Sequence, residues 1–194
     1  MRLFAAVIPP PAQLAELARE VDRLGRLPGA DRLRWTARPG WHFTLAFMGE
    51  VGEELLPDLR ARLGRAAHRT APFPLRLHGG GRFGRAVLWT GAAGGLDELR
   101  LLAERADAAA RRAGVPMDEH RAYHPHLTVA RSRAADTDLR PFVTELTDFE
   151  GTRWQVTELA LVRSHLPGGG PPGKQPRYET IATWPLGGAA EQGR

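Results

Sequence analysis

The sequence predicts an α+β protein built from two sheet-bearing lobes that share one interface. Strand-like and helix-like segments alternate along the chain with a rough symmetry about its midpoint. A His-x-Thr motif occurs once in each half, at residues 42–44 and 126–128. No long Gly/Ser linker separates the halves, so we expect one bilobal domain over residues 1–185 and a disordered tail over residues 186–194.

The first half is expected to alternate strands with amphipathic helices. Residues 3–8 form an apolar run of strand length, and residues 9–27 carry leucines at helical spacing. Residues 32–49 indicate an extended connection and then a strand that Gly49 ends, and residues 53–67 indicate a second helix. Two apolar segments around a glycine loop, residues 73–79 and 84–91, predict a hairpin.

The second half begins with the strongest helix pattern in the chain, from Asp97 to Arg112. Acidic residues occupy its first turn and arginines its last, as the helix dipole favours, and Gly114 follows. Later segments have shorter patterns. They predict a strand at 126–131, a short helix at 138–146 interrupted by Pro141, one long strand at 153–164, a loop at 167–176 and a final strand at 177–186.

Composition limits the classes of function. The 194 residues contain no cysteine, which excludes disulfides, thiolate metal sites and cysteine nucleophiles. No apolar run is long enough to span a bilayer, and the N-terminal apolar stretch is too soon broken by proline for a secretory signal, so we expect a cytoplasmic protein with no membrane partner. The net charge of +5 favours polyanionic partners, with a solvated arginine surface as the alternative.

The two His-x-Thr motifs suggest paired proton transfer, beside threonines that could hydrogen-bond a phosphoryl group. In a strand, residues i and i+2 share a face, so His42 lies beside Thr44 and His126 beside Thr128, while their apolar neighbours point to the other face. A lone histidine in this setting is more often a polar residue on a wet face. Two copies instead suit paired proton transfer, because a neutral imidazole can accept a proton while a protonated one donates.

The motifs and their surroundings resemble the two-histidine (2H) phosphoesterase superfamily. The segment RWTARPGWHFTLAFMGEV resembles the first-motif region of the RNA 2',3'-cyclic phosphodiesterases, also called 2'-5' RNA ligases. The hairpin at residues 77–89 and the segment YHPHLTVAR resemble their middle hairpin and second motif. The N-terminal RLFAAVIPP and the late LALVRSHLPGGG and RYE fit the same family, so the resemblance extends over about residues 2–183.

The resemblance implies a bilobal fold with pseudo-twofold symmetry and no metal or cofactor. It implies opening of a 2',3'-cyclic phosphate at an RNA end to leave a 2'-phosphate, with reversible 2'-5' joining as a side reaction. His42 would protonate the departing 3' oxygen and His126 would activate water, although the motifs alone leave the roles exchangeable. Thr44, Thr128 and Arg131 would hold the phosphate. We expect a monomer, with His124 a bystander near the groove.

Other motifs and functions are weaker alternatives. The G-x-G-x-x-G at 79–84 leads into a strand rather than a helix, and the glycine-rich 168–175 lacks the hydroxyl of a phosphate loop. His120, His124 and His126 could bind a metal, but no acidic ligand has a recognisable spacing to them. A non-catalytic RNA-binding module and a phosphodiesterase of small cyclic nucleotides remain open as rival functions.

Overall fold

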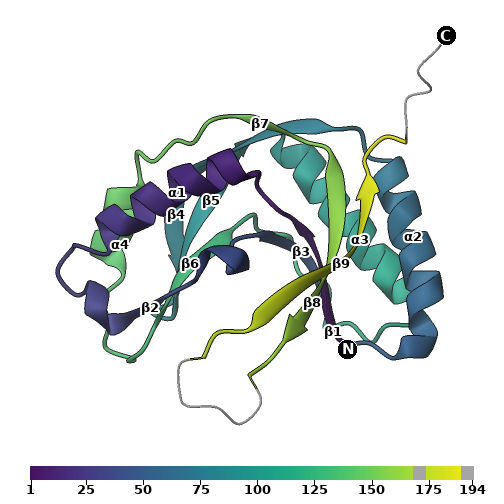
Figure 1. Cartoon of the computed structure of the whole chain (residues 1–194), viewed down its shortest axis with the longest axis horizontal. Coiled ribbons are helices and arrows are strands. Elements are labelled where there is room, and N and C mark those ends of the chain that lie inside the picture. Colours follow the sequence, from purple (N-terminus) through teal and green to yellow (C-terminus); the bar gives the residue numbers. More distant parts are fainter. Residues whose placement is uncertain (168–173, 189–194) are drawn as a thin grey trace.

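Two antiparallel sheets form the two lobes of the molecule (Figure 1). A computed structural model describes residues 1–167 and 174–188. The four-stranded sheet has the order β3 (Phe43–Glu50), β1 (Arg2–Val7), β8 (Glu158–His165), β9 (Arg177–Pro185). The five-stranded sheet has the order β2 (Leu33–Trp35), β6 (Leu127–Ser132), β5 (Val87–Gly94), β4 (Phe73–Phe83), β7 (Trp154–Val156).

Each sheet is covered by two of the described α-helices. Helices α1 (Pro11–Leu24) and α4 (Arg140–Leu146) lie over the five-stranded sheet, and α2 (Leu56–His68) and α3 (Leu96–Arg112) over the four-stranded sheet (Figure 1). Short 3₁₀ turns occupy Ala30–Arg32, Arg38–Gly40 and Glu53–Leu55. The predicted bilobal α+β architecture is confirmed, and so are its strongest helices.

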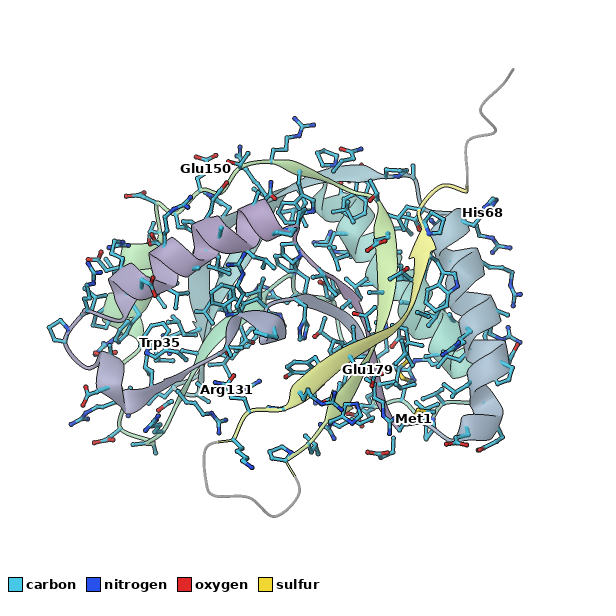
Figure 2. All side chains as sticks on the ribbon, viewed as in Figure 1. Met1, Trp35, His68, Arg131, Glu150 and Glu179 are labelled. Atoms are coloured by element: carbon cyan, nitrogen blue, oxygen red, sulfur yellow. The ribbon has the colours of Figure 1, made fainter. Side chains whose placement is uncertain are left out.

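The helices pack through the leucine and alanine stripes that predict them. Leu17 and Leu24 of α1, Leu59 and Leu63 of α2, and Leu99 of α3 are fully buried. Burying such a side chain contributes about 1.5–3 kcal/mol, so each stripe holds its helix on its sheet. Side chains fill the space between helices and sheets (Figure 2), and one hydrophobic cluster runs through both lobes.

A second, smaller cluster lies on the other face of the four-stranded sheet. Because side chains alternate along β1, Leu3, Ala5 and Val7 face the main core while Phe4 and Ala6 face away from it. There they pack with Ala160, Val162 and Tyr178. This outward apolar face forms the base of the site described below.

Three sequence expectations are wrong in detail. Pro141 does not interrupt α4 but stands in its first turn, where the missing N–H costs nothing. The long strand expected at 153–164 is divided at Thr157 into β7 and β8, which belong to different sheets. The strand expected to end at Gly49 continues to Glu50, because Gly49 adopts φ +64° opposite a register shift in β1.

The glycines expected to form the hairpin loop lie within strand β4 instead. A Cβ on Gly80 would meet the Leu146 side chain and one on Gly81 would overlap the Trp89 indole, so close packing requires both glycines. The turn is formed by residues 84–86. Gly81 thereby leaves room for the Trp89 ring next to the second histidine motif.

The chain is still packed where the tail is expected to begin. Leu186 is buried and its N–H donates to the Thr157 carbonyl, while the Gly187 N–H donates to the Ala67 carbonyl. Residues 189–194 of the expected tail lie outside the described residues.

Candidate active site

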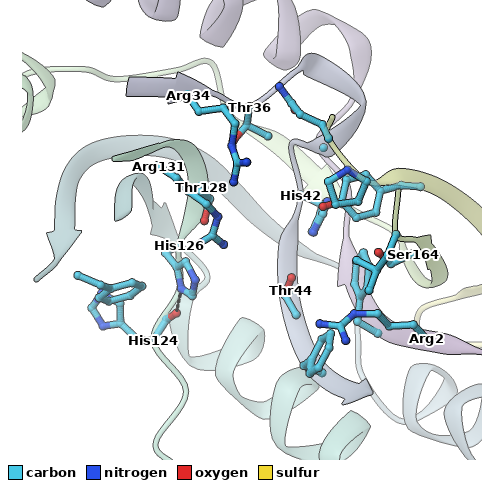
Figure 3. A pocket seen from close by; sticks show the side chains of 18 of the residues that line it. Arg2, Arg34, Thr36, His42, Thr44, His124, His126, Thr128, Arg131 and Ser164 are labelled. Carbon is cyan, nitrogen blue, oxygen red and sulfur yellow. Dashed lines mark hydrogen bonds between the residues drawn. The ribbon is translucent and has the colours of Figure 1, made fainter. Parts of the chain in front are cut away.

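The structure brings all five predicted site residues into one groove between the two sheets (Figure 3). The groove has a volume of about 790 Å³. His42 immediately precedes β3 and Thr44 lies within it, whereas His126 immediately precedes β6, which carries Thr128 and Arg131. The residues between them, such as Phe43 and Leu127, are fully buried, and this alternation presents each His-x-Thr pair to the groove.

His42 stands in an aromatic enclosure on the four-stranded sheet. Its ring stacks on Phe4 with centroids 4.6 Å apart, and Tyr178 meets it edge-on at 5.2 Å. Burial among these rings, together with the positive charge of His126 when it is protonated, lowers the pKa of His42 from 6.5 to about 4. His42 is therefore neutral at pH 7.

His126 is oriented by a hydrogen bond that determines its tautomer. Its Nδ1 lies 2.7 Å from the carbonyl oxygen of His124, and a carbonyl can only accept, so Nδ1 carries the proton. The neutral ring then has its lone pair on Nε2. Burial lowers the pKa of His126, the His124 carbonyl partly opposes this effect, and the positive charges of His124 and Arg131 add to it.

Positive charge in the groove comes from four arginines, Arg2, Arg34, Arg121 and Arg131. No carboxylate lines the groove in the part of the chain that the structure describes. Arg34 of β2 pairs directly with Arg131 of β6 in the sheet register. Like charges at directly opposed positions destabilise a sheet, so this pair suits a site whose ligand is an anion. Figure 3 shows Arg34 and Arg131 on the same side of the groove as Thr128.

Aromatic rings flank His126 on the five-stranded sheet. Phe83 meets the His126 ring edge-on with centroids 4.7 Å apart, and His124 contacts both Phe83 and Trp89. Phe83 is 39% exposed, which is unusual for a side chain of that size. His124, expected to be a bystander, instead holds the His126 ring through its carbonyl and lines the groove.

Gln175 connects the two lobes at the edge of the groove. Its Oε1 accepts from the Ala37 N–H and its Nε2 donates to the Trp35 carbonyl, both at 2.8 Å. Gln175 lies just before β9, whereas Trp35 and Ala37 belong to β2 and its exit. Of the 167–176 loop, residues 168–173 lie outside the described part of the chain, so only Gln175 and Pro176 are seen to line the groove.

The histidines considered as metal ligands do not form a three-residue ligand set in the described part of the chain. Within residues 1–167 and 174–188, no three histidine, aspartate or glutamate side chains converge as ligands. His120 lies 3.6 Å from Asp107 instead of joining the other histidines.

No described helix has the length and apolarity to cross a bilayer.

Sequence reasoning missed the groove residues that come from distant segments. Phe4 and Tyr178 reach His42 only through sheet pairing, and Gln175 reaches the other lobe only through loop closure, so no local pattern reveals them. Arg34 had a local signal. Residues 34 and 36 are two positions apart and would share one face of a strand. Strand β2 is only three residues long, however, and its sequence favours an extended connection between elements.

Comparison with known proteins identifies the family. The model of the 2'-5' RNA ligase superfamily matches residues 9–167. The chain belongs to this superfamily. It is 34% identical over 186 residues to the RNA 2',3'-cyclic phosphodiesterase of Thermus thermophilus, an alignment that covers 88% of this chain and 85% of the relative. A relative of the same name from Geobacillus stearothermophilus is 31% identical over 163 residues; the match covers 81% of this chain but only 49% of that longer protein.

Solved structures of the superfamily share the fold. Escherichia coli LigT complexed with 3'-AMP has a TM-score of 0.74 and 28% identity, over 95% of this chain and 97% of that one. The TT0787 protein of Thermus thermophilus has a TM-score of 0.72 and 30% identity, over 97% and 100% of the two chains. The superfamily fold therefore accounts for both lobes.

Proposed function

We propose that the protein hydrolyses a 2',3'-cyclic phosphodiester at an RNA end to a 2'-phosphomonoester, with His42 and His126 as the proton-transfer pair. One observation carries the proposal: two histidines from separate sheets line a single groove that is rich in arginine. The names of the relatives as RNA 2',3'-cyclic phosphodiesterases and the complex of LigT with 3'-AMP support it.

In the proposed reaction His126 is the base and His42 the acid. Nε2 of His126 takes a proton from water, whose oxygen attacks the phosphorus atom. The bond between phosphorus and the 3' oxygen breaks, and His42 gives its proton to that oxygen. The product is a 2'-phosphomonoester beside a free 3'-hydroxyl. A 5'-hydroxyl of another RNA attacking in place of water would leave a 2'-5' linkage by the same steps.

The environment of each histidine supports this division of roles. The base must be neutral with a lone pair toward the substrate, and the hydrogen bond from Nδ1 to the His124 carbonyl leaves that lone pair on Nε2 of His126. The acid must be protonated, which the protein alone disfavours because the pKa of His42 lies near 4. A phosphodiester anion placed between the histidines raises this pKa, so the substrate itself helps to charge the acid.

The remaining groove residues stabilise the phosphate. Thr44 and Thr128 each donate a hydroxyl hydrogen bond to a phosphate oxygen, one from each lobe. Arg131 supplies positive charge, and Arg34 beside it adds a second guanidinium. These positive charges stabilise the transition state more than the bound substrate, because negative charge develops on the phosphate oxygens during the reaction.

The proposal can be tested with a short RNA that ends in a 2',3'-cyclic phosphate, incubated in EDTA. The intact protein should yield only the 2'-phosphate, identified by chromatography against 2'- and 3'-phosphate standards. His42→Ala and His126→Ala should each lose at least a hundredfold in kcat, the usual contribution of a general acid or base. His78→Ala, an exposed histidine of β4 outside the groove lining, is the matched control.

The same assay separates the rival functions. RNA binding without turnover would indicate a non-catalytic RNA-binding module. Turnover of 2',3'-cyclic mononucleotides but not of oligonucleotides would indicate an enzyme of small cyclic nucleotides.

We further propose that the protein acts as a monomer on cytoplasmic RNA, since one chain supplies both histidines. Sedimentation at the assay concentration tests the oligomeric state.

A further inference from the structure

A second basic hollow lies between helices α2 and α3, outside the groove described above. It has a volume of about 260 Å³. Among the described residues, five arginines and one acidic residue, Glu104, line it. The arginines are Arg62, Arg65 and Arg69 of α2 and its end and Arg105 and Arg112 of α3. We call it the α2–α3 groove.

The helical periodicity of both segments builds this groove. The lining residues recur every three or four positions on each helix, so each helix presents one face to it. Its alanines, Ala66, Ala108 and Ala109, are small, whereas its long side chains are mainly arginines. The result is a hollow whose long lining side chains are mainly guanidinium groups.

Intramolecular contacts satisfy only part of this charge. Arg62 pairs with Asp58 at 2.7 Å, and Arg105 donates to the Arg69 carbonyl and the Thr70 hydroxyl. Arg65, Arg69 and Arg112 are exposed, and their side chains make no ion pair within residues 1–167 and 174–188. Unpaired like charges gathered in one hollow repel each other, and a bound polyanion relieves that repulsion.

The distribution of charge over the whole chain supports a specific role. The groove between the sheets and the α2–α3 groove together contain nine arginines and one acidic residue. The rest of the chain carries 18 basic and 21 acidic residues, out of 27 and 22 in total. The net positive charge therefore comes from two hollows and not from an evenly spread arginine surface.

The two hollows lie apart on the molecule. In Figure 2, Trp35 and Arg131 of the first groove lie left of centre, whereas His68, at the end of α2, lies at the right edge. Helix α2 contacts β9, so the α2–α3 groove is on the side of the four-stranded sheet that faces away from the histidines. A ligand that occupies both hollows must extend around this sheet.

We propose that the α2–α3 groove binds phosphates of the RNA chain upstream of the end that reacts. This inference rests on the proposed function, because it assigns a second contact to the same substrate. Guanidinium groups match phosphate oxygens with paired hydrogen bonds, and a basic groove follows the backbone of a single strand. Short substrates reach only the catalytic groove, so the second contact acts on long RNA alone.

The test compares a trinucleotide with a 20-nucleotide RNA, both ending in a 2',3'-cyclic phosphate. The variant Arg65→Glu, Arg69→Glu, Arg112→Glu should raise KM for the long RNA at least tenfold, with kcat unchanged and kcat/KM for the trinucleotide within twofold. The corresponding triple glutamine variant should have a smaller effect of the same kind. A control with the same change in net charge reverses three exposed arginines of the other lobe, Arg19, Arg26 and Arg153.

Binding without turnover provides an independent readout. In the His42→Ala background, the affinity for the 20-nucleotide RNA should depend less steeply on salt when the three arginines are reversed. The logarithmic slope should fall by about 2, since each phosphate contact to a single strand contributes about 0.7.

If KM for the long RNA rose equally in the triple variant and its control, the proposal would be overturned, because the change in net charge alone would explain both effects. An unchanged KM for the long RNA would overturn the proposal as well. Binding of anionic lipid vesicles to this surface would not rescue it, because the proposed ligand is RNA. If the intact protein turns over no cyclic-phosphate RNA, the proposed function fails. The groove would then stand only if reversal of its arginines still weakened RNA binding more than the control.

Discussion

The half-buried position of His42 among aromatic rings has a consequence for stability that can be measured without any substrate. Its pKa is lowered from 6.5 to about 4, so the folded protein resists protonation that the unfolded chain accepts. Stability should therefore be lost as the pH falls from 6.5 toward 4. Between pH 7 and pH 4.5 the loss attributable to His42 is about 2 kcal/mol, worked from this shift at about 1.4 kcal/mol per pKa unit.

The measurement is the free energy of unfolding in urea at pH 7 and at pH 4.5, for the intact protein and for His42→Gln. The glutamine is polar and does not titrate, so the acid-induced loss should be about 2 kcal/mol smaller in the variant. Other groups that titrate in this range affect both proteins and cancel in the difference. Equal losses in the two proteins would refute the enclosure of a neutral imidazole between Phe4 and Tyr178.

Three further predictions concern activity. The rate constant kcat/KM should peak below pH 6.5 and fall about tenfold per pH unit above it. This constant reports the free protein, in which His42 must carry a proton to act as the acid although its pKa is near 4. A value of kcat/KM still rising at pH 8 would contradict this. Arg34→Gln should raise KM about tenfold yet increase unfolding stability by a few tenths of a kcal/mol, since it removes repulsion opposite Arg131; a thermal melt and steady-state kinetics test both signs. Gln175→Leu should raise KM more than it lowers kcat, because the Ala37 N–H and Trp35 carbonyl lose their shared partner; a fall in kcat alone would contradict a positioning role.

Most of the fold was predictable because its elements have strong internal periodicity. Helix α3 shows its buried stripe, its charged ends and its terminal glycine in the sequence alone. The errors occur where a residue responds to a distant neighbour. Gly80 and Gly81 resemble a loop in sequence, but the packing of Leu146 and Trp89 requires them in a strand. Nothing local to Thr157 indicates that the chain passes there from one sheet to the other.

The candidate site was predictable to the extent that its residues repeat. The doubled His-x-Thr motif pointed to four groove residues, and Arg131 followed from the family resemblance. The groups that set the pKa and the orientation of the two histidines belong to no repeated motif. Phe4 and Tyr178 reach His42 from strands at the start and the end of the chain, and the orienting group of His126 is a backbone carbonyl, which no sequence motif encodes.

The two histidines have similar motifs but unlike surroundings, and this difference explains how similar half-sites can take opposite roles. His42 stands among aromatic rings that remove water from it and lower its pKa, so at pH 7 it holds a proton only when an anion is near. Burial and the guanidinium of Arg131 lower the pKa of His126, so its ring is neutral at pH 7, and the acceptor at Nδ1 fixes the lone pair on Nε2. Because the phosphate anion favours a proton on His42, while the carbonyl keeps the lone pair of His126 on Nε2, binding of the substrate itself establishes the acid and the base.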